Sequence, residues 1–265
     1  MLYLISTPIG NLDDISYRAV KILSSCDYIL CEDTRKSVKL LNHLKIKKKI
    51  VSYHKFSEAK KLTSIIEDLE NNKEIALISD GGTPIICDPG LLLLKKAIEK
   101  NIEYTALPGP CSIINALVLS GFDSIPFQFL GFLEKKPSSL KKQLKKMVYY
   151  DGVSIAFESP KRLLKTLKEF DKIDPEKNLV VARELTKKFE EIKRGKAKEL
   201  YNHFIKKSVK GEIVLIAEKN EVDFKELDVH DLLKFLVESG NSPKEALKLA
   251  QKIKKEKLYN KVKKL

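Results

Sequence analysis

The feature that most constrains the fold is residues 75–90, IALISDGGTPIICDPG, where a short apolar run stops at a loop rich in Gly, Pro and Asp. Residues 75–78 are continuously apolar, which is typical of a central parallel strand covered on both faces. The glycines and prolines that follow permit tight turns and close approach of the backbone to a ligand. Ligands of open α/β sheets bind beyond the carboxyl ends of strands, so we expect a ligand loop here. The alternative is an ordinary strand-to-helix turn.

The composition indicates a folded protein whose charge suits a polyanionic partner. With 265 residues, 43% of them hydrophobic, the chain can form one large domain or two of ordinary size. The net charge of +14 suits a polyanion, but abundant lysine also occurs on ordinary solvated surfaces, so the charge alone does not decide between the two. Four of the few arginines lie in polar, turn-flanked segments, where a guanidinium fork can hold phosphate or carboxylate. They are Arg35, Arg162, Arg183 and Arg194.

The cysteines and histidines do not indicate a metal site. The four cysteines have no CxxC spacing and the four histidines are scattered along the chain. Reduced, buried thiols are typical of cytoplasmic proteins. The first residues, MLYLISTPIG, lack the features of a signal peptide, and no apolar run approaches the roughly 20 residues of a membrane span. We therefore expect a cytoplasmic protein with no metal and no membrane partner.

Strand and helix patterns alternate through residues 1–120, which predicts βαβ units and a parallel sheet in a first α/β domain. The expected strands are 2–6, 28–31, 50–53, 75–78 and 104–107. A turn-rich stretch at 121–126 opens a second α/β domain, 121–222. Its expected strands are 127–132, 153–157, 179–185, 188–195 and 212–217, of which 188–195 makes the sheet mixed. We expect Thr34 to cap a helix after strand 28–31. Residues 223–265 are expected to form a basic helical tail, in which Ser242 caps the last helix.

Three strand-end loops of the first domain place Pro and Gly where main-chain groups stay unpaired. They are TPIGN at 7–11, SDGGTP at 79–84 and LPGPCS at 107–112. On one sheet edge they would form a cleft lined by main chain, which suits an adenine nucleoside with an amino-acid tail. Neither a G-x-G-x-x-G nor a P-loop motif is present, so dinucleotide and P-loop binding are disfavoured. Two polar strand tips of the second domain, 158–162 and 183–187, are expected to close over the cleft.

These motifs resemble those of the bacterial 16S rRNA cytidine 2′-O-methyltransferases, a branch of the tetrapyrrole methylase superfamily. The resemblance covers essentially the whole chain and rests on TPIGNLDDI at 7–15, CEDTRKS at 31–37, SDGGTPIICDPG at 79–90, FESPKRLL at 157–164 and VARELTKKFEEIKRG at 181–195. Gly81 stands where the family usually has Ala, and Cys87 where it usually has Ser. Both replacements are small, so we expect the loop geometry to survive.

The resemblance implies two α/β domains, S-adenosylmethionine as methyl donor, a homodimer, and 16S rRNA or the small ribosomal subunit as partner. The reaction would be 2′-O-methylation of a cytidine in the decoding region. The implied cofactor contacts are Pro8, Gly10, Gly82, Thr83, Pro84, Pro108, Gly109, Ser112, Ala182, Arg183 and Glu184. The basic residues that border these motifs are the expected RNA contacts, and we expect most of them to bind phosphate groups. They are Arg35, Lys36, Lys135, Lys136, Lys161, Arg162 and Lys187.

Methyl transfer to a ribose hydroxyl needs in-line placement and a group that accepts the hydroxyl proton. The candidates for that group are Asp33, His54, Asp80, Glu158 and Glu184. Each also has a structural reading. Asp33 would be a helix-start charge, Asp80 a turn former and His54 a half-buried strand-end residue. The two glutamates would be partners of Arg162 and Arg183.

Two other functions remain open from the sequence. One is a methyltransferase for a small tetrapyrrole-like substrate, against which the excess positive charge argues. The other is a non-catalytic RNA-binding or ribosome-assembly factor, which would have no need for intact strand-end loops.

Overall fold

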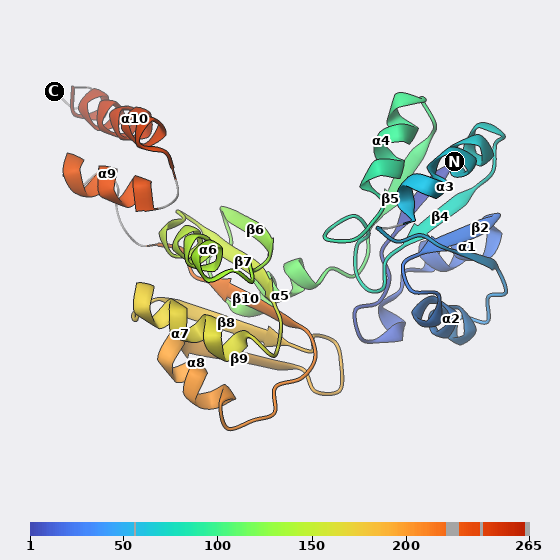
Figure 1. Ribbon diagram of the computed structural model, residues 1–265, viewed down its shortest axis with the longest axis horizontal. Helices are drawn as coiled ribbons and strands as arrows, with labels where there is room; N and C mark the ends of the chain where they lie inside the picture. The colour runs from blue at the N-terminus through green and yellow to red at the C-terminus, as the bar shows by residue number, and fades with distance from the viewer. Residues whose placement is uncertain (56, 221–227, 239–240, 263–265) are drawn as a thin grey trace. The chain divides into compact units, whose positions relative to one another are not determined.

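The computed structural model describes residues 1–55, 57–220, 228–238 and 241–262, with side chains as far as Lys254 except that of Glu238. Within these ranges the chain forms two compact units (Figure 1). The first unit comprises Met1–Ser112 together with Leu185–Lys188, and the second comprises Ile113–Glu184 and Phe189–Leu265. The expected domain boundary at residue 121 follows helix α5, whereas the division between the units falls at the start of that helix. The expected start of the tail, residue 223, lies outside the described residues.

The first unit holds a parallel sheet of five strands in the order β3-β2-β4-β1-β5. The strands are β1 Leu2–Ile5, β2 Tyr28–Cys31, β3 Lys49–Ser52, β4 Ile75–Ile78 and β5 Tyr104–Leu107. The connecting helices are η1 Leu12–Asp14, α1 Tyr17–Ser25, α2 Thr34–His43, α3 Glu58–Glu70 and α4 Leu91–Glu99. The predicted parallel sheet is confirmed, and β4 lies at its centre with all four side chains buried.

Both faces of this sheet are covered, which explains why β4 is apolar throughout. One face packs against α1 and α2 through Ala19, Leu23 and Leu41. The other face packs against α3 and α4, with Ile65 and Leu93 among the buried side chains. Because neither face of such a strand meets solvent, apolar and polar residues do not alternate along it.

The second unit holds a mixed sheet in the order β6-β7-β10-β8-β9. Its strands are β6 Phe127–Phe132, β7 Val153–Glu158, β8 Asn178–Arg183, β9 Glu191–Lys196 and β10 Ile213–Ala217. β6 and β7 are parallel, and the other neighbours are antiparallel. The mixed sheet is confirmed, but its last paired strand begins at Glu191, three residues later than the pattern predicted. The helices are α5 Ser112–Ser120, α6 Pro137–Tyr149, α7 Leu163–Ile173, α8 Ala197–Phe204, α9 Val229–Glu238 and α10 Pro243–Val262.

Of the two helix caps predicted from the sequence, one is wrong and one is confirmed. Helix α2 is capped by Asp33, whose carboxylate accepts the N–H of Arg35, so the prediction of Thr34 as cap is wrong. Ser242 does cap α10, since its backbone N–H donates to Glu245 and its hydroxyl accepts the N–H of Glu245. Among the described residues no helix has both the length and the apolarity needed to cross a membrane.

Candidate active site

Two of the three predicted loops are joined directly at the carboxyl edge of the parallel sheet. Thr7, after β1, and Gly82, after β4, form a two-way backbone bridge with N–O distances of 3.0 and 2.8 Å. The Thr7 hydroxyl donates to the carbonyl of Ser79, and the Ser79 hydroxyl donates to that of Gly82 at 2.7 Å. The loops at 7–11 and 79–84 therefore form one hydrogen-bonded platform.

Ser6 links this platform to the third loop. Its Oγ lies 3.1 Å from Thr83 Oγ1 and 3.3 Å from the carbonyl oxygen of Leu107, and Thr83 Oγ1 in turn lies 3.5 Å from that of Pro110. The hydroxyls of Ser6 and Thr83 thus connect the ends of β1, β4 and β5. The convergence of the three loops, expected from the sequence, is present in the first unit.

Glycine is required at two points of this platform. Gly82 has φ of +89°, a conformation that side chains other than glycine rarely adopt. A Cβ on Gly109 would stand 2.8 Å from Ser6 Cβ, closer than such atoms come. Pro108 and Gly109 are exposed while Gly82 and Pro84 are buried, so the third loop offers main chain to a ligand and the second supports it.

A network of charged side chains lies at the same edge, beyond β2. Asp33 binds the Arg35 guanidinium through Oδ1 at 3.0 Å and Oδ2 at 2.7 Å, which lowers the pKa of Asp33 to about 2. Asp80 pairs with Lys36 at 3.0 Å. The Arg35 side chain is 87% exposed despite its ion pair, so its outer face is open to a ligand.

Asp88, which was not among the sequence candidates, is the carboxylate with the most unusual environment at this edge. Burial, followed by the charges of Glu32 and Asp80, raises the pKa of Asp88 to about 6, with Lys36 opposing the shift. Asp88 lies in the 79–90 motif, which the sequence marks as a ligand loop. Its burial and its closeness to carboxylates of other loops cannot be predicted from the local sequence. His54 lies at the turn before α3, where its backbone N–H donates to Ser57 Oγ.

In the second unit, Glu158 and Arg162 form an internal structural pair. The Glu158 side chain is fully buried, accepts from the hydroxyl of Thr166, and binds the Arg162 guanidinium at 2.7 Å. The same guanidinium donates to the carbonyls of Leu133 and Glu134 at 3.0 Å. Arg162 thus links the end of β6 to the start of α7, and much of its guanidinium is used in hydrogen bonds within the protein.

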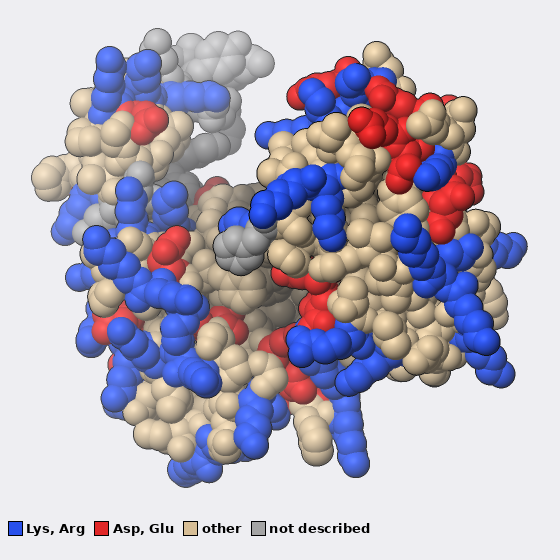
Figure 2. Space-filling view, turned by 45° about the vertical axis from the view of Figure 1, so that its right-hand side comes forward, with Lys and Arg blue, Asp and Glu red and all other residues tan. Residues whose placement is uncertain are grey.

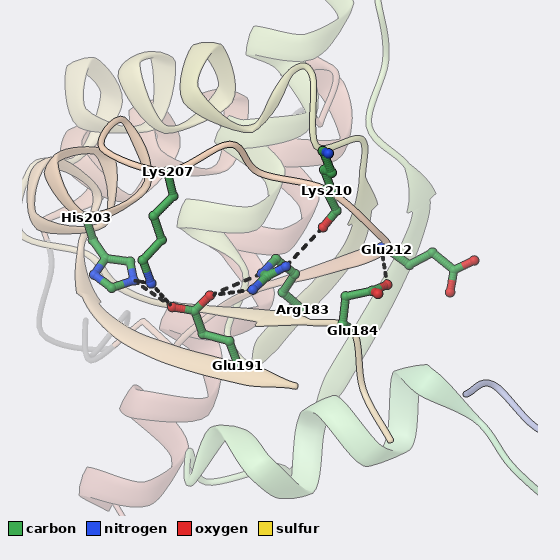
Figure 3. Close-up of polar contacts among 7 residues, drawn as sticks. All are labelled: Arg183, Glu184, Glu191, His203, Lys207, Lys210 and Glu212. Atoms are coloured by element: carbon green, nitrogen blue, oxygen red, sulfur yellow. Dashed lines mark hydrogen bonds and ion pairs between the residues drawn. The ribbon is translucent and has the colours of Figure 1, made fainter. Parts of the chain in front are cut away.

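Arg183 belongs to a second internal network, drawn in Figure 3. Its guanidinium binds Glu191 Oε2 at 3.0 Å and donates to the carbonyl of Lys210. His203 Nε2 and Lys207 Nζ each approach Glu191 Oε1 at 2.7 Å. Burial alone would raise the pKa of Glu191, but the hydrogen bonds from Lys207, His203 and Arg183 outweigh it and lower the pKa to about 2.

Glu184 points into the neighbouring turn. Its Oε1 accepts the backbone N–H of Glu212 at 3.0 Å, and a Cβ on Gly211 would collide with its carboxylate. Ala182 is buried within β8. The predicted lysine contacts are at the surface: Lys36, Lys135, Lys136 and Lys161 are exposed and Lys187 is half-buried. Figure 2 shows Lys and Arg side chains over much of the visible face, with Asp and Glu in smaller groups. No cluster of potential metal ligands occurs in the described part of the chain.

Comparison with known proteins identifies the family. Residues 1–201 match the family described as Tetrapyrrole (Corrin/Porphyrin) Methylases. A relative from Mycoplasmopsis pulmonis, named ribosomal RNA small subunit methyltransferase I, is 45% identical over 81% of this chain and 96% of its own length. A Streptococcus pyogenes relative of the same name is 36% identical over 97% of this chain and 93% of its own. The chain belongs to the ribosomal RNA small subunit methyltransferase I family of tetrapyrrole methylases.

Solved structures confirm the tetrapyrrole methylase fold predicted for this family member. Diphthine synthase aligns with a TM-score of 0.66 at 14% identity, covering 84% of this chain and 91% of that one. A cobalt precorrin-4 methyltransferase aligns with a TM-score of 0.59 at 18% identity, covering 82% and 94%. At these identities the likeness shows the fold alone. Family membership supports S-adenosylmethionine as the methyl donor.

Proposed function

We propose that this chain transfers a methyl group from S-adenosylmethionine to the ribose 2′-hydroxyl of a cytidine in the decoding region of 16S rRNA. The observation that carries the proposal is the convergence of the three strand-end loops in a chain that belongs to this methyltransferase family. An RNA substrate also implies that the protein works in the cytoplasm.

The loop platform fits the cofactor. Its exposed main chain at Gly10, Pro108 and Gly109 supplies donors and acceptors of the kind that a nucleoside and an amino-acid tail require. Gly82, Thr83 and Pro84 would form the supporting wall, with Pro8 and Ser112 beside it. When bound, S-adenosylmethionine supplies an electrophilic methyl group, so the task of the protein is to hold that group in line with the ribose oxygen.

Charged residues beyond β2, in the second unit and in the segment Leu185–Lys188 would bind the RNA. Arg35 combines a guanidinium with 87% exposure, which suits a phosphate contact that fixes the backbone without reading sequence. Lys36, Lys135, Lys136, Lys161 and Lys187 are proposed to add phosphate contacts. For Arg162, the bonds to Glu158, Leu133 and Glu134 favour a supporting role over a direct hold on RNA.

The ribose hydroxyl needs a proton acceptor, and the carboxylates differ in basicity. A group with a pKa of about 2, such as Asp33, is a weak base, whereas a raised pKa matches a proton acceptor near neutral pH. Asp88, with a pKa of about 6, therefore joins His54 and Asp80 as a candidate in the first unit. Glu158 and Glu184 make internal bonds that favour structural roles.

We also propose that two copies associate through the outer face of α5. Val118 is 73% exposed, Ile114 45% and Leu119 38%, an unusual run of apolar side chains for a free helix surface. A second copy that buries this face would remove the apolar surface from water.

The decisive experiment supplies the purified protein and labelled S-adenosylmethionine to small ribosomal subunits, and to naked 16S rRNA, from cells lacking this gene. We expect label in the small-subunit rRNA, mapped as a 2′-O-methylated cytidine. Cofactor binding without methylation of either RNA would favour a small-molecule substrate. RNA binding without cofactor binding would favour a non-catalytic assembly factor.

A further inference from the structure

The segment Leu185–Lys188 belongs to the first unit, although the chain on both sides of it belongs to the second. It follows β8 after one residue, Glu184, and the polar network of Figure 3 lies at the end of that strand. Four residues from the second half of the sequence therefore lie among the loops of the first unit. We call this segment the strap.

The strap packs on the loop that follows β1. The hydroxyl of Thr186 accepts the backbone N–H of Asn11 at 3.0 Å. A Cβ on Gly10 would lie 2.6 Å from Thr186 Oγ1 and 2.8 Å from the carbonyl oxygen of Leu185, so glycine alone permits this approach. The contact involves the TPIGN loop, which also bridges to Gly82 through Thr7.

The backbone is held in an unfavourable conformation in the strap and at Glu184, the residue just before it. Thr186 has φ of +62° and Glu184 φ of +53°, both in the left-handed region. A β-branched residue rarely adopts this region, and such outliers persist where the surrounding structure imposes them. The conformation directs the Thr186 hydroxyl to Asn11, so the bond is obtained at the expense of local strain.

The two residues just before the strap are fixed within the second unit. The Glu184 carboxylate accepts the N–H of Glu212, and Gly211, with φ of +92°, leaves room for that carboxylate. Arg183, one residue earlier, is fixed by Glu191 and the carbonyl of Lys210. The strap therefore leaves β8 from a rigid origin.

We propose that Thr186 is a positioning residue for the cofactor: through its bond to Asn11 it holds the TPIGN loop in the conformation that binds S-adenosylmethionine. This inference rests on the proposed function only in taking the loop platform as the cofactor site. Thr186 acts through the loop and not on the reacting atoms. Its hydroxyl, and not its bulk, carries the effect.

The test measures the Kd of S-adenosylmethionine alone, by calorimetry, together with the Tm of each full-length variant. Thr186→Val keeps shape and strain but removes the acceptor, and we expect Kd to rise about fivefold, as for one lost hydrogen bond. Thr186→Ser should bind within about twofold of wild type because it keeps the hydroxyl. Thr186→Gly relieves the strain, so its Tm should stay level or rise while its Kd rises as in Thr186→Val.

The matched control is Tyr28→Phe, which removes a 2.8 Å hydrogen bond to Asp68 at the opposite end of β2. We expect it to lower Tm and leave Kd unchanged. Wild-type Kd in both Thr186→Val and Thr186→Gly would overturn the inference, as would equal weakening in Thr186→Ser. A wild-type protein that binds the cofactor but methylates no rRNA refutes the proposed function while these Kd values still decide the role of Thr186. A wild-type protein that binds no cofactor refutes both.

Discussion

The Asp80 carboxylate accepts the backbone N–H of Asp33 at 3.0 Å, which ties the loop after β4 to the helix cap after β2. Its other oxygen pairs with Lys36. This double engagement indicates that Asp80 organises the sheet edge. Asp80→Asn retains an acceptor for the Asp33 N–H, so we expect methylation within about threefold of wild type. Asp80→Ala leaves that N–H without its acceptor and should cost about 1–3 kcal/mol of unfolding free energy, measured by urea denaturation. Loss of activity in Asp80→Asn at unchanged stability would instead identify Asp80 as the proton acceptor.

Arg35 and Arg162 should respond differently to truncation. Arg35 is exposed, so Arg35→Ala should leave Tm within a degree or two and raise the KM for rRNA, with the cofactor Kd unchanged. Arg162→Ala removes the cationic partner of the buried Glu158, and it should lower the unfolding free energy by about 3 kcal/mol. Steady-state methylation and thermal melts separate the two effects. The division of roles is contradicted if Arg162→Ala melts like wild type.

The sequence predicted the main elements of the site because their signals are local. The apolar run of β4 and the Gly and Pro after it specify a buried strand and a tight loop, and parallel pairing brings the strand ends together. The bond from Asn11 to Thr186 joins residues 175 positions apart, and no local pattern indicates it. The cap of α2 was misassigned because Asp33 and Thr34 are adjacent and both residue types cap helices. The raised pKa of Asp88 depends on burial and on charges from other loops.

Asp88 should make stability depend on pH in an identifiable direction. Its pKa in the folded protein, about 6, exceeds the ordinary aspartate value of 3.8, so between these values the folded state binds more protons than the unfolded state. The contribution of Asp88 to the unfolding free energy therefore falls as pH rises from 4 to 6. Asp88→Asn removes the charge. At pH 8 the unfolding free energy of this variant should exceed that of wild type by about 1–2 kcal/mol, allowing for solvent screening. Urea denaturation across this range should show the gain vanish near pH 4. A gain that does not change with pH would contradict the assigned environment.

The proposed association through α5 predicts a monomer when that face becomes charged. Val118 is 73% exposed, so Val118→Asp should not disturb the fold of a single copy but should place a carboxylate in the apolar contact. Light scattering after size exclusion should give a dimer mass for wild type and a monomer mass for the variant, with unchanged circular dichroism. The matched control is Val229→Asp, which alters an apolar side chain of similar exposure, 55%, on α9 and should leave the dimer intact. A wild-type monomer would refute the association.

Glu191 should stabilise the second unit over a defined pH range. Its pKa of about 2 lies below the ordinary glutamate value of 4.5, so its contribution to stability is complete above pH 4.5 and is lost as pH falls towards 2. Glu191→Gln leaves Arg183, His203 and Lys207 without their shared carboxylate, and we expect a loss of about 2–4 kcal/mol at pH 7. Lys207→Gln is the matched control, because that side chain is 49% exposed and its pair should contribute less than about 1 kcal/mol. Denaturation of both variants at pH 7 and pH 3 should show the difference between Glu191→Gln and wild type shrink in acid. Equal losses in the two variants would show that Glu191 is not the centre of the network, and the rigid origin of the strap would then need another source.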